Sequence, residues 1–453
     1  MPSPTRPETG RDRWRGFPSL SSSRTVTDST MVPMDTLPAL RADIDLVTAR
    51  LEGRDVILVR DTLGIVPPNA SLSGEVAPYL PLFNGSSTIV DLQTVMMRRH
   101  GGSLVFRSDA ERIVAELSRL GVLQTEAVLR EKEKIVREFT ESPEREAILA
   151  GSSYPADPGT LSALIDRILA HPASPADPLP APPCALAAPH IDLRVSERTY
   201  AAAYRAIRGL SPSAILLLGT GHALGESRYS VSGKTFKTPL GRVPADREAA
   251  ARIRAAAGEA LAPDDFVHRN EHSLEFQLLF LQRLFPMTEV PVLPVLCGQM
   301  EDLFGALRSP LEAPGIASFV EAVAAWLSEP PEGKLVVAGV DLSHVGPKFG
   351  DLHTGRELEP AFRAYDREVL DALAAGDASA FFLAGARTRN RHRICGFSAL
   401  WTLLAVLPGV RGTVLDYDAW HEEPTRSAVS FAAVAFTPGS PPESLGAPLP
   451  SSG

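Results

Sequence analysis

The 453-residue sequence predicts an α/β fold, in which a mainly parallel sheet flanked by helices follows a small α+β domain. From residue 152 onward, short apolar segments alternate with amphipathic segments of helical length, which is the pattern of strand–helix–strand units. Several of these strands are apolar throughout, as in SAILLLGTGH and KLVVAGVDLSH. Such strands are typical of parallel sheets that are covered on both faces.

The composition excludes several classes of protein. With 44% apolar and 22% charged residues the chain is of the globular type, and its net charge of −9 argues against a nucleic-acid partner. No apolar run approaches the roughly 18 residues of a membrane span, and the N-terminus lacks the apolar segment of a secretory signal. Three scattered cysteines do not make a disulfide framework. We therefore expect a cytoplasmic protein without a membrane partner.

The length and the shifts in composition predict two domains between disordered ends. The expected regions are a disordered tail at 1–36, a small domain at 37–125, a helical linker at 126–144, the main domain at 145–437 and a second disordered tail at 438–453. The Pro-rich stretch 171–184 is expected to be a loop.

The small domain is expected to contain a hairpin followed by helices. DVILVRDTLGIV has two apolar runs around a turn, and we read it as the hairpin. Two helical stretches joined at Asn84-Gly85 follow, the second capped by Ser87 or Thr88. A third helix has Ser108 as its cap, Glu111 completing a capping box, and Gly121 at its end.

The order of these elements resembles that of the small winged-helix PqqD-like domains. The frame FNGSSTIVDL…LSRLGVL carries the resemblance, which covers about 85 residues. Those domains bind leader peptides in peptide-modification pathways, so the resemblance implies a peptide or a pathway protein as partner.

The main domain is predicted from twelve segments. The expected strands are 184–189, 213–222, 290–296, 334–344, 412–419 and 427–436, and the expected helices are 159–170, 197–210, 318–329, 357–376, 395–407 and the C-terminal part of 263–285.

Three histidines lie at the ends of separate strands of this sheet. His190 follows CALAAP, His222 ends SAILLLGTGH, and His344 ends KLVVAGVDLSH, three residues after Asp341. Ligands of open α/β sheets bind beyond the carboxyl ends of the strands. A single histidine there is more often a hydrogen-bonded structural residue, but three of them in one sheet predict a shared site.

Two further residues are weaker candidates when read alone. His272 stands at the start of a helix that Asn270 could cap, with Glu275 one turn away, so the simple reading is a surface histidine beside a carboxylate. Cys395 directly precedes a helix, where the macrodipole stabilises a thiolate, although an inert buried cysteine is the commoner case. Cys184 and Cys297 fit the inert interpretation. Imidazole and thiolate together suit iron, copper or zinc.

The chain is similar to the Memo family, known in prokaryotes as AmmeMemoRadiSam system protein B. The matching segments, in family order over roughly 290 residues, are AGSSYPADPGTL, AAPHIDLRVS, LLLGTGHAL, KTFKTPLG, NEHSLEFQL, PVLCG, DLSHVGPKFGD, RICGFSAL and SAVSFAAVAF. The resemblance implies the fold of class III extradiol dioxygenases, an α/β sandwich around a mononuclear metal site.

The resemblance also implies a role for each site residue. The metal ligands would be His190, His222 and Cys395, and His344 would be the acid/base. His272 and Asp341 match the other polar residues of the pocket. His190 is followed by Ile191-Asp192 where many members have small residues, which suggests an added carboxylate near the metal.

Three functions remain open on the sequence. The leading one is a metal-dependent redox enzyme, with Fe(II) as the first choice of metal and Cu or Zn as alternatives, an unknown small-molecule substrate, O₂ as co-substrate, and His344 moving protons. The second is a non-catalytic module that binds a ligand or peptide in a radical-SAM-associated pathway. The third is a hydrolase that uses Zn²⁺-bound water.

Overall fold

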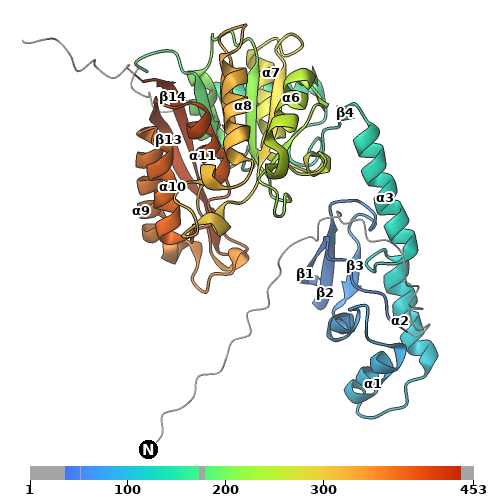
Figure 1. The fold of residues 1–453 in the computed structure, drawn as a ribbon. Helices are drawn as coiled ribbons and strands as arrows, with labels where there is room; N and C mark the ends of the chain where they lie inside the picture. Colours follow the sequence, from blue (N-terminus) through green and yellow to red (C-terminus); the bar gives the residue numbers. More distant parts are fainter. Residues whose placement is uncertain (1–35, 52, 173–178, 440–453) are drawn as a thin grey trace, which may run out of the picture. The chain divides into compact units, whose positions relative to one another are not determined.

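The computed structural model describes residues 36–51, 53–172 and 179–439 (Figure 1). The chain forms two compact units, Met1–Glu141 and Ser142–Gly453, and each is described by itself. The break between them falls within the predicted linker. The two predicted tails lie outside the described residues, except for Thr36, Pro438 and Gly439.

The N-terminal unit has a three-stranded antiparallel sheet in the order β1-β2-β3, followed by helices. Its elements are β1 (Ile44–Leu51), β2 (Arg54–Asp61), β3 (Ser71–Ser73), the 3-10 helix η1 (Gly74–Leu82), α1 (Ile89–Arg99), α2 (Arg107–Arg119) and α3 (Glu126–Glu141). Apolar residues from both sheet and helices, among them Ile57, Leu72, Leu92 and Leu117, form the core of this unit.

The predicted hairpin is wrong in its position. DVILVRD lies in one strand, β2, which pairs with β1 before it in the chain and with β3 after it. The chain leaves the sheet after β2 because the carboxylate of Asp61 accepts hydrogen bonds from three backbone N–H groups, those of Leu63, Ile65 and Val66. The second apolar run is therefore part of a turn, and it pairs with no strand.

The helix caps were predicted with mixed success. Thr88 caps α1 and forms a capping box with Asp91, as expected for one of the two candidates. Helix α2 begins two residues earlier than predicted, because its N-cap is Phe106 and not Ser108, and because Asp109, and not Glu111, accepts the hydrogen bond from the backbone N–H of Phe106 at 3.0 Å. Gly121, with a φ of 77°, follows the end of α2 as predicted.

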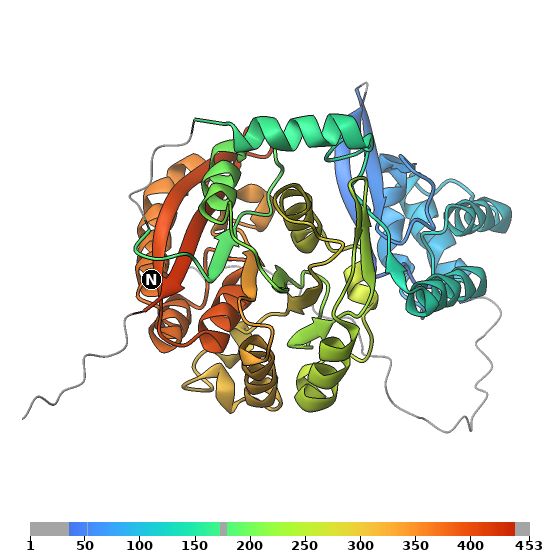
Figure 2. The same ribbon diagram turned by 90° about the horizontal axis from the view of Figure 1, so that it is seen from above.

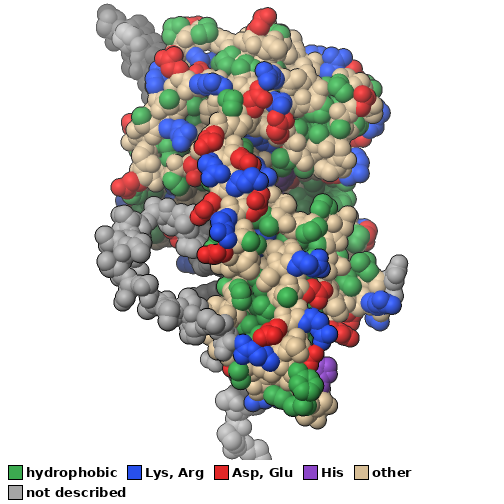
Figure 3. All heavy atoms as spheres, turned by 90° about the vertical axis from the view of Figure 1, so that its right-hand side faces the viewer, with side chains coloured by type: hydrophobic (Ala, Val, Ile, Leu, Met, Phe, Trp, Pro, Cys, Tyr) green, Lys and Arg blue, Asp and Glu red, His purple; other side chains and the backbone are tan. Residues whose placement is uncertain are grey.

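Helix α3 is a charged helix, as predicted. Opposite charges lie three or four residues apart along it, as in Arg130–Glu126 and Lys134–Glu131. Figure 3 views the side of the molecule that lies on the right in Figure 1, and it shows acidic and basic side chains interspersed there. The charges on this face are therefore mixed, and they do not gather into a basic stripe.

The C-terminal unit is built on an eight-stranded sheet whose path runs β12-β14-β5-β11-β6-β10-β7, with β13 paired to β14. The strands are β5 (Ala185–Ala188), β6 (Ile215–Thr220), β7 (Tyr229–Val231), β10 (Val292–Cys297), β11 (Leu335–Gly339), β12 (His344–Val345), β13 (Val410–Glu422) and β14 (Ser427–Pro438). The central four, β5, β11, β6 and β10, are parallel. Antiparallel strands flank them on both sides, so the sheet is mixed where a mainly parallel one was predicted.

Helices cover both faces of this sheet (Figures 1 and 2). They are α4 (Pro158–Leu169), α5 (Glu197–Ala206), α6 (Arg247–Ala257), α7 (Ser273–Leu284), α8 (Ile316–Ser328), α9 (Gly355–Ala374), α10 (Ala378–Thr388) and α11 (Phe397–Val406). Helices α4, α5 and α7 pack on one face, and the other five pack on the opposite face. A small separate sheet contains β4 (Glu144–Arg145), β8 (Thr235–Thr238) and β9 (Gly241–Val243).

Candidate metal centre

The register of the central strands brings two of the three predicted strand-end histidines, His190 and His222, to one edge of the sheet together with Asp341, whereas His344 lies beyond the end of β11, in β12. Ala188 of β5 pairs with Gly339 of β11, which in turn pairs with Gly219 of β6. His190, Asp341 and His222 follow these three positions by two, two and three residues. Parallel strands carry their carboxyl ends to one edge of the sheet, so the side chains converge there.

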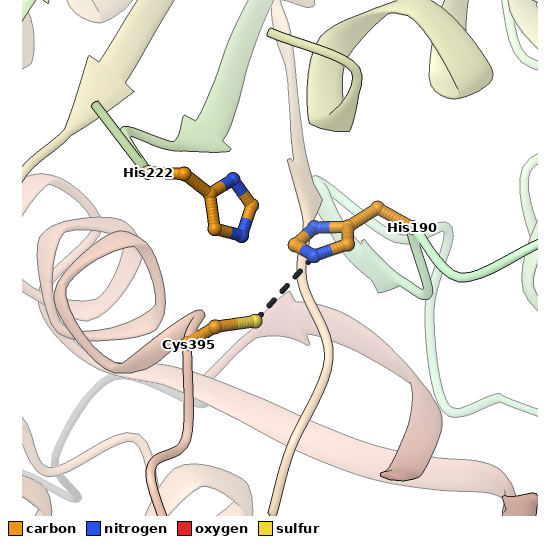
Figure 4. A group of neighbouring side chains, drawn as sticks. All are labelled: His190, His222 and Cys395. Carbon is orange, nitrogen blue, oxygen red and sulfur yellow. Dashed lines mark hydrogen bonds between the residues drawn. The ribbon is translucent and has the colours of Figure 1, made fainter. Parts of the chain in front are cut away.

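His190 is held in one orientation by its backbone and by its ring. Its backbone N–H donates to the Asp341 carboxylate at 3.0 Å, and its Nδ1 lies 2.9 Å from the carbonyl oxygen of Gly339. A carbonyl oxygen only accepts hydrogen bonds, so Nδ1 carries the proton. The buried ring therefore presents Nε2 towards Cys395, whose Sγ lies 3.4 Å away (Figure 4).

Cys395 reaches this edge from the segment before α11. Its Sγ, Nε2 of His190 and a ring nitrogen of His222 lie within 4.8 Å of one another, and Figure 4 shows the three side chains directed towards a common point. Burial opposes ionisation of the thiol, but the charges of His190 and His344 and hydrogen bonds with His190 and His222 lower the pKa of Cys395 well below its ordinary value. Burial disfavours the charged form of His190, but the charges of Asp341 and Cys395 and the hydrogen bond with Cys395 raise the pKa of His190 to about 9.

His222 is oriented by Glu271. Its Nδ1 lies 3.1 and 3.0 Å from the two carboxylate oxygens, and its backbone N–H donates to Oε2 at 3.3 Å. Burial disfavours the imidazolium, but hydrogen bonds with Cys395 and Glu271 raise the pKa of His222 well above its ordinary value. The side chain is 40% exposed, so this edge of the centre is open to solvent.

Glu271 is a residue that the sequence analysis missed. It is 5% exposed, and it forms with His222 and His272 the second group of described residues whose ligand atoms lie within 4.8 Å. Burial alone would favour the neutral acid, but its hydrogen bond from His222 and the charges of His222 and His272 lower the pKa of Glu271. The available signal was the acidic residue directly before His272 in NEHSLEF.

His272 packs against the rings of both His190 and His222. Its ring centroid lies 5.1 Å from that of His190 and 5.1 Å from that of His222, with which it is nearly parallel. Burial and the nearby histidines lower the pKa of His272 to about 4, so the ring is neutral at physiological pH. The expectation of a histidine beside a carboxylate holds, but the carboxylate is Glu271, 3.3 Å from Nδ1.

Two details of this expectation are wrong. Asn270 does not cap α7, because the helix begins after His272. Glu275 points away from the centre and is fully buried, where it accepts hydrogen bonds from the backbone N–H groups of Ile148 and Leu149 and pairs with Arg145. Sequence spacing places Glu275 near His272, but packing against the segment at residue 145 turns it inward.

Asp341 and His344 complete the edge. Asp341 is buried, accepts hydrogen bonds from His190 and Ile191, and places Oδ2 3.6 Å from Nε2 of His190. His344 lies outside both groups of potential ligands among the described residues. Its Nδ1 lies 2.9 Å from the carbonyl oxygen of Leu342, so this contact occupies Nδ1 and not Nε2.

Asp192 does not supply the added carboxylate that its position suggested. Arg194 donates hydrogen bonds to it from the backbone, from Nε at 2.9 Å and from Nη2 at 2.5 Å. The other two cysteines also lie outside the centre, as expected. Burial raises the pKa of Cys184, and it raises that of Cys297 to about 12, so both remain thiols.

The donor set fits a transition metal. A thiolate and two imidazoles, each imidazole with its Nδ1 bound to an oxygen acceptor, are the ligands that iron, copper and zinc take in proteins. Metal binding requires the thiolate form of cysteine and a deprotonated ligand nitrogen on each imidazole. His190 and His222 meet the geometric part of this requirement because their Nδ1 atoms are already engaged.

In the part of the chain that the structure describes, no helix is both long and apolar enough to cross a membrane.

Comparison with known proteins finds a match to the Memo-like protein family over residues 145–435. A MEMO1 family protein of Aquifex aeolicus is 32% identical over 389 residues, which is 84% of this chain and 96% of the relative. One of Thermus thermophilus is 33% identical over 77% of this chain and 99% of the relative, and one of Archaeoglobus fulgidus is 26% identical over 64% and 97%. The family match covers more than half of the sequence and includes every residue of the candidate centre, so the chain belongs to the Memo family.

Proposed function

We propose that this protein binds one redox-active metal ion through His190, His222 and Cys395 and acts as a metal-dependent redox enzyme. The observation that carries the proposal is the convergence of the three ligand atoms within 4.8 Å, on chain segments that are up to 205 residues apart. Fe(II) is our first choice and Cu our second. The likeness in fold to class III extradiol dioxygenases that family membership implies supports iron, and the thiolate supports copper.

The metal would supply one-electron chemistry, and three protein ligands leave positions for further ligands. The chain's own residues perform the remaining tasks. The carbonyl of Gly339 fixes the ring of His190, while Asp341 fixes its backbone and adds a buried negative charge. His344, whose Nδ1 faces the Leu342 carbonyl, keeps Nε2 available to accept and return a proton. The neutral ring of His272 covers the two imidazole ligands.

The test is metal analysis of protein purified without oxygen, comparing the wild type with Cys395→Ala and with Cys184→Ala as the matched control. We expect one iron or copper ion per chain in the wild type and in Cys184→Ala, and a large loss in Cys395→Ala. Full occupancy in Cys395→Ala would remove the thiolate from the metal. Zinc alone, with no oxygen consumption under any reductant, would instead indicate a hydrolase that uses zinc-bound water.

For the N-terminal unit we propose that it is a PqqD-like winged-helix domain and that it binds an extended peptide of a radical-SAM-associated pathway. The observation that favours this role is the edge strand β1, which pairs with β2 along its whole length and with no other described strand. An open edge accepts a peptide as an additional strand. Peptides selected on the full chain by display should slow amide hydrogen exchange in β1 and leave β14 unchanged. Protection confined to other segments would contradict this role.

A further inference from the structure

The geometry points to Glu271 as the positioning residue of the centre: its carboxylate fixes His222 with the proton on Nδ1, so that Nε2 is free to bind the metal. This inference rests on the proposed function and adds a residue that holds a ligand without binding the ion.

The hydrogen bonds of Glu271 define the orientation of His222 at two points. Both carboxylate oxygens lie within 3.1 Å of Nδ1, and Oε2 also accepts the backbone N–H of His222 at 3.3 Å. Both oxygens already accept backbone N–H groups, Oε1 those of His272 and Ser273 and Oε2 that of His222, so the carboxylate acts as an acceptor on both sides and Nδ1 is the donor. The ring can then offer only Nε2 to the ion, and Nε2 is the atom on the side of Cys395 and His190 (Figure 4).

Glu271 is itself held rigidly. Its Oε1 accepts the backbone N–H groups of His272 and Ser273, each at 2.9 Å, at the start of α7. Helix α7 in turn lies directly against the sheet, because a Cβ atom on Gly339 would stand 2.3 Å from the carbonyl oxygen of Ser273. The orientation of His222 is therefore transmitted from the packing of a helix on the end of β11.

A second possibility is that Glu271 binds a metal ion directly, together with His222 and His272, since their ligand atoms also lie within 4.8 Å. The hydrogen bonds argue against it. Oε1 already faces three N–H groups and Oε2 faces two, so a cation would have to displace bonds that begin α7 and orient His222. We infer one ion per chain, with Glu271 hydrogen-bonded to the ligand His222 and not bound to the ion itself.

A carboxylate that accepts a hydrogen bond from a histidine ligand typically raises metal affinity by about 10- to 100-fold in proteins. Glu271→Gln tests the effect because its amide oxygen can still accept the N–H groups of α7, while its NH₂ group turned towards Nδ1 would favour the wrong tautomer of His222. Glu271→Asp keeps the charge at a shorter reach. Asp265→Asn is the matched control, since Asp265 is a buried carboxylate that binds Ser232 and forms no hydrogen bond with a ligand.

The experiment titrates the metal-free full chain with Co²⁺ in competition with a chelator, and records the visible spectrum and the unfolding temperature. We expect one Co²⁺ per chain, about 10- to 100-fold weaker binding in Glu271→Gln, partial recovery in Glu271→Asp, and wild-type affinity in Asp265→Asn. The thiolate-to-cobalt band should persist in each variant, because Cys395 is unchanged.

Two results would overturn the inference alone. The first is wild-type affinity in a Glu271→Gln protein that unfolds at the wild-type temperature. The second is two ions per wild-type chain with one lost in Glu271→Gln, which would make Glu271 a ligand. If Glu271→Gln does not fold, the comparison rests on Glu271→Asp, which should then bind measurably more weakly than the wild type. A wild type that binds no Co²⁺ would overturn the proposed function, and this inference with it.

Discussion

Gly396 and Val340 are in such close contact that a Cβ atom on Gly396 would lie 2.3 Å from the Cβ of Val340. This contact joins the segment that carries Cys395 to the residues directly after β11, Val340 and Asp341. The hydrogen bond from the backbone N–H of Gly396 to the carbonyl oxygen of Asp341, at 3.3 Å, fixes the same approach. The distance between Cys395 and the two proposed histidine ligands therefore depends on the absence of a side chain at position 396.

Gly396→Ala should destabilise the fold by about 1–3 kcal/mol, because the new methyl group must push these segments apart. Its φ of −81° is accessible to alanine, so the effect would be steric and not conformational. The variant should also bind Co²⁺ more weakly than the wild type. Urea unfolding and metal titration measure the two effects.

Gly233→Ala is the control, because its nearest neighbouring atom is 3.8 Å from the added Cβ. It should change stability by less than about 0.5 kcal/mol. Equal stability of the two variants would show that the segment moves freely and that the contact does not set the position of Cys395.

Arg145→Met should destabilise the protein by about 3–5 kcal/mol, the usual cost of leaving one partner of a buried ion pair alone. Arg145 and Glu275 are almost completely buried, at 1% and 0% side-chain exposure. The guanidinium also donates to the carbonyl oxygens of His268 at 3.0 Å and Glu271 at 2.6 Å. Urea unfolding gives the loss of free energy.

The matched substitution is Arg252→Met, which breaks an ion pair with Glu329 whose side chains are 52% and 40% exposed. It should cost far less stability than Arg145→Met does, because water screens the pair. A loss of similar size in both variants would mean that the buried pair has no special role. The Arg145 variant should also bind metal more weakly, since the loop that ends at Glu271 loses its support.

Acid should destabilise the protein between about pH 6.5 and pH 4, in part through His268. Burial lowers the pKa of this histidine to about 4, from an ordinary value of 6.5. In that pH range the unfolded chain binds a proton that the folded chain rejects, so the free energy of unfolding falls as pH falls. The contribution of His268 is on the order of 3 kcal/mol when the pH reaches its folded-state pKa.

His268→Gln should therefore flatten the dependence of stability on pH below 6.5, as measured by urea unfolding at a series of pH values. His353→Gln, at a side chain that is 69% exposed, should leave the slope unchanged. His272 and His392 also have a pKa of about 4 in the folded protein, so some slope will remain in the His268 variant. A slope identical to that of the wild type would contradict the prediction.

The histidines of the centre could be predicted from the sequence because they depend on a simple topological rule. Residues that follow parallel strands meet at one edge of a sheet, and this rule predicted that His190 and His222 lie together, without any knowledge of loops. The rule also placed His344 at the end of a strand with them, but β11 ends at Gly339 and His344 begins β12, outside both groups of potential ligands among the described residues. Cys395 does not follow a strand; its place before a helix made it a weak candidate, and its role as a ligand was predicted mainly from the family resemblance. The mixed sheet was not predicted because a buried strand is apolar throughout whether its neighbours run parallel or antiparallel, as β14 shows.

Glu271 was missed for a different physical reason. It lies in a loop whose course is set by hydrogen bonds from Arg145, a residue 126 positions earlier in the chain. The local pattern of apolar and polar residues around Glu271 does not predict a contact with so distant a residue. For the same reason, Glu275 was placed beside His272 by helical spacing, although it faces the interior.

The three proposed ligands come from segments that adjoin only when the sheet of the C-terminal unit is assembled, since Cys395 and His190 are 205 residues apart. An unfolded chain has no such site, so the proposed metal ion would bind only the native state and would add its binding energy to the stability of that state. Each tenfold rise of free metal above the dissociation constant would add about 1.4 kcal/mol. The melting temperature should therefore report the supply of metal, and a chelator should act as a denaturant of the C-terminal unit.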